Sequence, residues 1–164
     1  MPQARFCLHC GAPLAGRVIE NTPRLACSAE GCGYVFWDNP LPVVAGVVEL
    51  GGRIVLARNR AWPEKTFGLV TGFMERDESP EEAVAREVKE ELDLDALSVG
   101  LIGVYPFQRK NEVILAYHVV AEGEITLNEE LAEFRLIPPE KLRPWDFGTG
   151  LAVRDLLRSR GLSV

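Results

Sequence analysis

Three glutamates recur at helical spacing in residues 86–91, which read Arg-Glu-Val-Lys-Glu-Glu. At about 100° per residue, Glu87, Glu90 and Glu91 fall in one sector of a helix about 100° wide. The apolar residues of the same helix fall in the adjacent sector, so the carboxylates are expected at the edge of the core. Carboxylates at this spacing repel one another unless a cation lies between them. Their oxygen atoms suit Mg²⁺ or Mn²⁺, so the spacing predicts a divalent-metal site.

The alternative is an acidic helix face that is simply solvated, which is common for runs of charge. The preceding loop favours the metal site. It is entered through Gly72, carries Glu78 and leads into a helix capped by Ser79 and Glu82, the S-x-x-E capping box. Pro80 fits the first helical position. A glycine turn, an acidic loop and a helix bearing carboxylates form a rigid support for metals that carry phosphate.

All four cysteines lie near the start of the chain, as Cys7-x2-Cys10 and Cys27-x4-Cys32, separated by sixteen residues. Zinc takes four thiolates in a tetrahedron, commonly supplied in pairs from two tight turns, and glycine follows the second cysteine of each pair. A structural zinc site is therefore predicted, because four thiolates leave no position open for water. Two disulfides, or four unrelated thiols, are the alternatives, and His9 could replace one cysteine.

The segments that position these residues alternate between strands and two helices. The segment 39–42, Asn-Pro-Leu-Pro, marks a boundary between residues 1–39 and 40–164. One helix is predicted from Pro80 to about Leu92, and a second after a capping Thr149. Strands are predicted at residues 43–50, 53–58, 67–73, 97–105, 113–121 and 134–137. The fold class is therefore α+β with a mixed sheet.

Charge and hydrophobicity restrict the partners. The net charge is −6, and residues 75–95 alone carry ten acids and three bases, so the rest of the chain is close to neutral. An acidic chain is a poor ligand for nucleic acid, and none is expected as a partner. No apolar run is long enough to cross a membrane, and the first residues lack the apolar stretch of a signal peptide. A cytoplasmic location is expected.

The acidic helix and its loop resemble the Nudix hydrolase family, whose pattern is G-x5-E-x7-R-E-U-x-E-E-x-G-U with U aliphatic. The specified positions are occupied by Gly72, Glu78, Arg86, Glu87, Val88, Glu90, Glu91 and Leu94. Only Asp93 departs, because the family has glycine there. Aspartate tolerates the left-handed conformation with which a helix ends, so the departure concerns the helix terminus and not the chemistry.

The resemblance covers about residues 40–160 and implies the Nudix fold, an α/β/α sandwich around a mixed sheet, preceded here by a small zinc ribbon. It implies that Glu87 and Glu91 bind Mg²⁺ or Mn²⁺, that Glu90 binds or assists, and that the carbonyl of Thr71 is a further ligand. A more distant acid also contributes in the family. It is expected among three neighbouring glutamates, with Glu130 first and Glu129 and Glu133 as alternatives.

The catalytic set that the resemblance implies is Glu87, Glu90, Arg86 and Glu78. Divalent ions neutralise phosphate oxygens and lower the pKa of water, which assists attack on a diphosphate. Glu87 is the first candidate for accepting the proton of the attacking water, and Glu90 is the second. Arg86 lies beside Glu90 on the helix and is expected to orient it.

A four-cysteine ribbon before such a domain resembles the branch of NADH pyrophosphatase and its FAD- or ADP-ribose-cleaving relatives. Phe73, after the motif glycine, fits that branch. The NADH-selective enzymes carry S-Q-P-W-P-F-P-x-S, of which only Pro106-Phe107 survives here, so strict NADH preference is not expected. The predicted substrate contacts are Tyr105, Phe107, Gln108, Phe73 and Arg58. Further candidates are Arg60 and Arg109 for phosphate, and Trp62, Trp145 and Phe147 for stacking on a ring.

The expected reaction is cleavage of a dinucleotide-type diphosphate such as NADH, FAD or ADP-ribose to two monophosphates. One alternative is a nucleoside triphosphate pyrophosphohydrolase, and another is a non-catalytic regulator that senses a nucleotide. The complete carboxylate set favours catalysis. A nucleic-acid-binding ribbon is disfavoured, because residues 1–39 hold three bases and three acids. Relatives with this ribbon are often dimers, so a homodimer is a further expectation.

Overall fold

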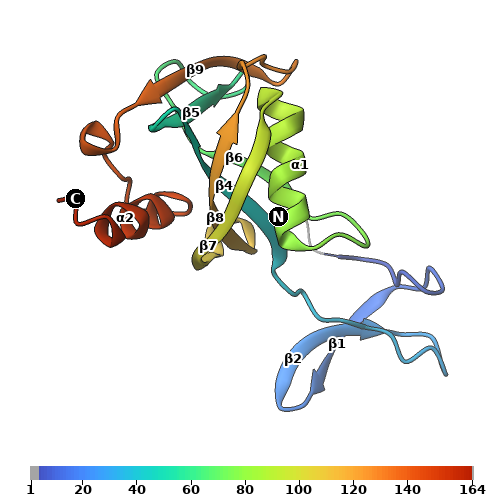
Figure 1. The fold of residues 1–164 in the computed structure, drawn as a ribbon. Helices are drawn as coiled ribbons and strands as arrows, with labels where there is room; N and C mark the ends of the chain where they lie inside the picture. Colours follow the sequence, from blue (N-terminus) through green and yellow to red (C-terminus); the bar gives the residue numbers. More distant parts are fainter. Residues whose placement is uncertain (1–3, 164) are drawn as a thin grey trace. The chain divides into compact units, whose positions relative to one another are not determined.

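The computed structural model describes residues 4–163. The chain divides into two compact units, Met1–Asn39 and Pro40–Val164. The first unit is built on a three-stranded antiparallel sheet of β1 (Leu14–Ile19), β2 (Thr22–Cys27) and β3 (Val35–Phe36), shown in Figure 1. Glu20 and Asn21 form the turn between β1 and β2, both with positive φ, as a two-residue hairpin turn requires. The cysteines lie on the loops of this unit and at the end of β2.

The second unit is built on a six-stranded mixed sheet. Its strands are β4 (Leu41–Leu50), β5 (Arg53–Asn59), β6 (Val70–Phe73), β7 (Asp95–Phe107), β8 (Glu112–Glu122) and β9 (Leu131–Ile137). The order is β7-β8-β4-β5-β9, and β6 also pairs with β4. β4 runs parallel to β8, and all other pairings are antiparallel. The predicted mixed sheet is therefore confirmed.

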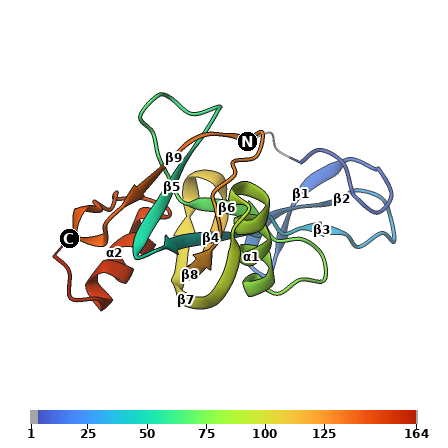
Figure 2. The same ribbon diagram turned by 45° about the horizontal axis from the view of Figure 1, so that its top comes forward.

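Helices α1 (Pro80–Leu92) and α2 (Gly150–Ser159) cover opposite faces of this sheet, as Figures 1 and 2 show. Successive residues of β4 point to opposite faces. Val44 accordingly packs in one core cluster with Val88 of α1, and Ala45 packs in the other with Val153 of α2. The predicted α/β/α sandwich is confirmed. No helix within residues 4–163 is long and apolar enough to cross a membrane.

The ends of α1 follow the sequence closely. The Ser79 hydroxyl accepts a hydrogen bond from the amide of Glu82 at 3.3 Å, and the Glu82 carboxylate accepts one from the amide of Ser79 at 2.8 Å. Asp93 ends the helix with φ 56°, so aspartate occupies the left-handed position expected of glycine. The predicted capping of the last helix by Thr149 is only partly confirmed. Thr149 holds the N-cap position of α2, but its side chain makes no capping hydrogen bond.

Other differences from the predicted elements concern the bounds of two strands and the presence of two short helices. β6 begins at Val70 and not at residue 67, because Gly68 makes only an isolated bridge with Ala57. β9 begins three residues earlier than predicted, at Leu131. Two short 3-10 helices, η1 (Gln108–Lys110) and η2 (Pro139–Lys141), were not predicted. η1 lies in the connection between β7 and β8, which borders the site described next.

Candidate active site

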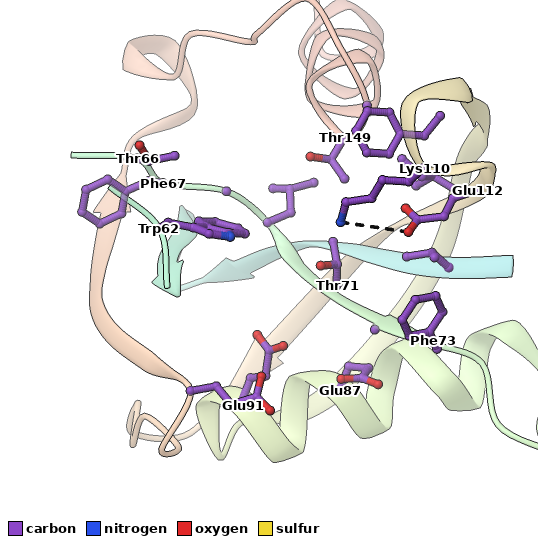
Figure 3. Close-up of a pocket in the computed structure, with 18 of the residues that line it drawn as sticks. Trp62, Thr66, Phe67, Thr71, Phe73, Glu87, Glu91, Lys110, Glu112 and Thr149 are labelled. Atoms are coloured by element: carbon purple, nitrogen blue, oxygen red, sulfur yellow. Dashed lines mark ion pairs between the residues drawn. The ribbon is translucent and has the colours of Figure 1, made fainter. Parts of the chain in front are cut away.

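One pocket of about 1070 Å³ lies between α1, β6 and the loops at one edge of the sheet, and Figure 3 shows its lining. Six glutamates line it, and four of them are the ones predicted for the divalent metal, namely Glu87, Glu90, Glu91 and Glu130; the other two are Glu75 and Glu112. Aromatic side chains form other walls, namely Trp62, Phe67, Phe73, Phe107, Trp145 and Phe147. Thr71 of β6 also lines the pocket. The structure therefore places the residues predicted for the divalent metal along one pocket, with aromatic rings in its other walls.

Arg86 organises the acidic wall. Its guanidinium forms two hydrogen bonds with the Glu78 carboxylate, at 2.8 and 3.0 Å, and donates to Glu87 at 2.7 Å and to Glu90 at 3.2 Å. It also donates to the carbonyl of Phe73 at 3.1 Å. The hydrogen bonds from Arg86, together with that from the Glu75 amide, lower the pKa of Glu78. Glu78 therefore stays ionised and anchors Arg86, which holds the glutamates of α1 against the end of β6.

Gly72 is required by the position of Glu87. A Cβ atom on residue 72 would lie 1.9 Å from the Cδ atom of Glu87, far inside any contact distance. Gly72 pairs with Val44 of β4, so its backbone is fixed within the sheet. The glycine therefore lets the Glu87 carboxylate lie directly against the β6 backbone, next to Thr71. This contact explains the motif glycine through packing, since its φ is not left-handed.

Glu91 is the most perturbed carboxyl group of the pocket. Burial raises the pKa of Glu91 to about 8, and the charges of Glu87, Glu130 and Glu90 act in the same direction. Because the charge of Glu130 acts on Glu91, Glu130 lies close to α1. A backbone hydrogen bond from Asn128 to the carbonyl of Glu91 holds the two segments together. A carboxyl group in this setting ionises at neutral pH only when a cation compensates it.

The three candidates for the distant acid are placed differently. Glu130 lines the pocket. Glu129 does not, and its carbonyl accepts a hydrogen bond from Arg60 at 2.8 Å. Glu133 forms an ion pair with Arg58 across β5 and β9 at 3.5 Å. Of the three, Glu130 is therefore the one that lines the same pocket as Glu91.

The structure places only some of the predicted substrate contacts in the pocket. Phe73 and Phe107 line the pocket, but Tyr105, Gln108 and Arg58 do not. The Tyr105 hydroxyl instead donates to Asp155 of α2 at 2.7 Å. Sequence reasoning missed Lys110 and Glu112, which line the pocket beyond η1, and also Lys65 and Thr66. Lys110 and Glu112 could have been found from their position in the sequence, because they follow closely after the aromatic residue that ends β7.

Comparison with known proteins decides the family, because residues 40–155 match the NUDIX domain. The chain belongs to the Nudix hydrolase family. A NAD-capped RNA hydrolase NudC from Stutzerimonas stutzeri is 31% identical over 132 residues, which cover 80% of this chain and 46% of that protein. The protein of the same name from Mycobacterium bovis is 39% identical over 84 residues, 51% of this chain and 27% of that protein. The chain thus spans less than half the length of either relative.

A solved Nudix structure shares the fold. The crystal structure of a NUDIX hydrolase from Nitrosomonas europaea matches with a TM-score of 0.76 and 23% identity, over 98% of this chain and 96% of that one. Asp93 is the one departure from the family motif, and its left-handed φ shows that it replaces the glycine without altering the end of the Nudix helix. Three carboxylates of the Nudix motif, those of Glu87, Glu90 and Glu91, line the pocket, and the fourth, Glu78, is hydrogen-bonded to Arg86.

The unit preceding the Nudix domain gathers its four cysteines. The sulfur atoms of Cys7 and Cys32 lie 3.7 Å apart, those of Cys10 and Cys27 lie 3.5 Å apart, and all four lie within 4.8 Å of one another. All four are free thiols. Zinc–sulfur bonds of about 2.3 Å give sulfur separations of about 3.8 Å in a tetrahedron. The donor set therefore fits zinc, and it is the only such close His, Cys, Asp or Glu group within residues 4–163.

The environment of the sulfurs also fits a cation. Burial opposes ionisation of Cys7, but the amides of Cys10 and His9 outweigh it, and the pKa of this thiol falls to about 7. The Ala29 amide favours the thiolate of Cys27, but burial and the neighbouring sulfurs raise its pKa to about 12. Four thiolates cannot coexist here without a positive charge between them.

Protein purified without chelator is expected to contain about one zinc ion per chain, because the four sulfurs already converge. Cys7→Ser and Cys27→Ser are each expected to lower the zinc content and the thermal stability of the unit Met1–Asn39. Elemental analysis, with thiol titration before and after denaturation, measures both. Folded protein with four titratable thiols and no zinc would contradict the prediction.

Proposed function

We propose that this chain is a divalent-metal-dependent pyrophosphatase that cleaves a dinucleotide-type diphosphate to two monophosphates. The observation that carries the proposal is the pocket itself. It joins the four glutamates predicted for the metal, one of them half-buried with a raised pKa, to aromatic walls in a volume of about 1070 Å³. The proposal assigns residues 1–39 to a zinc ribbon and residues 40–164 to the Nudix domain.

The donor set of the pocket fits Mg²⁺ or Mn²⁺, because it consists of carboxylate oxygens that repel one another in the absence of a cation. Glu87, Glu91, Glu90 and Glu130 would hold the ions, with the carbonyl of Thr71 as a further ligand. Bound divalent ions would neutralise the diphosphate and lower the pKa of the attacking water.

The protein's own groups would position and deprotonate the nucleophile. One oxygen of Glu87 accepts a hydrogen bond from Arg86, which fixes the carboxylate and leaves its second oxygen for the proton of the attacking water. Glu90 is the second candidate for the base, and it is held by the same guanidinium. Both carboxylate oxygens of Glu78 accept hydrogen bonds from the Arg86 guanidinium. We therefore assign Glu78 to positioning Arg86 and not to proton transfer.

The substrate class rests on the aromatic walls and on the relatives. The relatives are named as hydrolases of NAD-capped RNA, and NAD is a dinucleotide joined by a diphosphate. A dinucleotide carries a ring system on each side of the diphosphate. Trp62 lies in the connection between β5 and β6 and Phe107 is the last residue of β7, so each could receive one ring. A nucleoside triphosphate offers one ring only, so it uses less of this surface.

The test is a comparison of kcat/KM for NADH, FAD, ADP-ribose, NAD-capped RNA and nucleoside triphosphates with Mg²⁺ or Mn²⁺. A dinucleotide-type diphosphate is expected to exceed every triphosphate by tenfold or more. Phe107→Ala is expected to raise KM for the preferred substrate about three- to tenfold, the range of one aromatic stack. Leu101→Ala, at an exposed side chain of β7 outside the pocket, is the control.

Two results would count against the proposal. A triphosphate that wins by tenfold or more would overturn the substrate class and leave the metal-dependent chemistry in place. Unchanged KM values and an unchanged substrate ranking in Phe107→Ala, with the same melting temperature as the parent, would show that this ring only packs.

A further inference from the structure

Glu112 is a carboxylate of the pocket that the proposed catalysis does not use. It is the first residue of β8, and its side chain is only 10% exposed. The exposed part of the Glu112 side chain borders the pocket. Its ion-pair partner is Lys110, whose Nζ atom lies 4.0 Å from a carboxylate oxygen. That distance is too long for a hydrogen bond, so within residues 4–163 the carboxylate faces the pocket without a protein donor at bonding distance, although nine-tenths of its side chain is buried.

The position of Glu112 separates it from the catalytic glutamates. It pairs with Phe107 across β7 and β8 and with Leu41 of β4, whereas Glu87 and Glu91 belong to α1. Figure 3 shows the Lys110–Glu112 pair on the far side of Thr71 from Glu87 and Glu91. If the glutamates of α1 hold the cation at the diphosphate, Glu112 would therefore contact a different part of the substrate.

The chemistry of the group restricts what it binds. An ionised carboxylate only accepts hydrogen bonds, and it has two oxygen atoms with which to accept them. Beside it lie the ring of Phe107 and the side chain of Ile114, which supply no donors. A buried carboxylate without donors costs free energy, so a ligand that brings two donors in one plane is favoured. The 2′ and 3′ hydroxyls of a ribose are such a pair.

We propose that Glu112 binds the ribose diol of the adenosine half of the substrate, with Lys110 beside it, and thereby selects against a 2′-phosphate. This inference rests on the proposed function, since adenosine ribose is shared by the dinucleotides considered there. A phosphate at the 2′ position would face the buried carboxylate at short range. Lys110 compensates poorly, because its side chain is 65% exposed and its charge is screened by water.

The direct test measures binding and not turnover. Dissociation constants are determined by calorimetry for AMP, 2′-deoxy-AMP and adenosine 2′,5′-bisphosphate with the full chain and Mg²⁺. AMP is expected to bind about tenfold or more tightly than either analogue, as for a hydrogen bond to a charged group. Glu112→Ala is expected to remove the preference for the 2′-hydroxyl. Glu112→Gln, which keeps the shape, is expected to remove the penalty on the 2′-phosphate.

Glu122→Gln is the matched control, because Glu122 is an exposed carboxylate at the other end of the same strand and outside the pocket. It is expected to leave all three dissociation constants unchanged. Glu112→Ala or Glu112→Gln that keeps the parent's full discrimination would overturn the inference. If the parent chain cleaves dinucleotides while these variants discriminate normally, only the ribose assignment fails. If the parent cleaves none, the proposed function fails, whatever AMP binding shows.

Discussion

Glu91→Gln is expected to lower kcat by at least about 10²-fold, because it removes a ligand from a site whose charge stabilisation supplies several kcal/mol. Glu87→Gln is expected to have an effect of similar size. The metal-free Glu91→Gln protein is also expected to be more stable than the parent at pH 8. Burial and three neighbouring carboxylates raise the pKa of Glu91 to about 8, so ionising it costs folding free energy when no cation is present.

The sign of the pH effect follows from that shift. The folded pKa lies above the ordinary value of 4.5, so the contribution of Glu91 to stability is complete below about pH 4.5 and is lost as the pH rises through 8. The difference in melting temperature between Glu91→Gln and the parent, measured in EDTA, is therefore expected to grow from pH 4.5 to pH 8. Glu122→Gln is the control, since its carboxylate is exposed at the end of β8 and lies outside the pocket. A constant difference across this range, or near-normal kcat, would contradict the assignment.

Gly72→Ala is expected to lower kcat by about 10²-fold, the loss expected when a catalytic group is misplaced by about 1 Å. The added methyl group would occupy the position of the Glu87 carboxylate, which must move away from β6. The control is Gly100→Ala, a change at a strand glycine of β7 whose Cβ position has no neighbour within 4 Å. Steady-state kinetics and thermal unfolding separate lost activity from lost folding.

A double variant shows whether the two residues act together. If Gly72→Ala acts by displacing Glu87, then Gly72→Ala combined with Glu87→Gln is expected to lose little more activity than Glu87→Gln alone. Additive losses would mean that Gly72 affects the site by another route. Near-normal kcat in Gly72→Ala, with a folded protein, would show that the carboxylate can work from elsewhere in the pocket.

The features that the sequence predicted well depend on local signals. The capping box fixes the start of α1, and the spacing of Glu87, Glu90 and Glu91 fixes which face of the helix carries them. The Gly51-Gly52 pair between the predicted strands 43–50 and 53–58 is a local turn signal, and both glycines have the positive φ of a hairpin turn that joins β4 to β5. These features depend on residues a few positions apart, so a single sequence is sufficient to predict them.

The features that the sequence did not predict depend on pairing between distant strands. Nothing local indicates that β4 runs parallel to β8, or that β5 pairs with β9. The second pairing places Arg58 opposite Glu133, which is why Arg58 makes an ion pair instead of facing substrate. Likewise Tyr105 meets Asp155 only because α2 packs against β7. Glu112 reaches the pocket through the same long-range arrangement.

The central claim is that the glutamates of this pocket direct metal-dependent cleavage of a dinucleotide diphosphate. Its most direct test is chromatography of the products formed from ADP-ribose, NADH and FAD by the full chain, with Mg²⁺ or Mn²⁺ and with EDTA. The account predicts that at least one of these substrates yields AMP and a second monophosphate in equal amounts, and only when a divalent ion is present. Absence of monophosphate products from all three substrates with metal, or equal cleavage in EDTA, would contradict it.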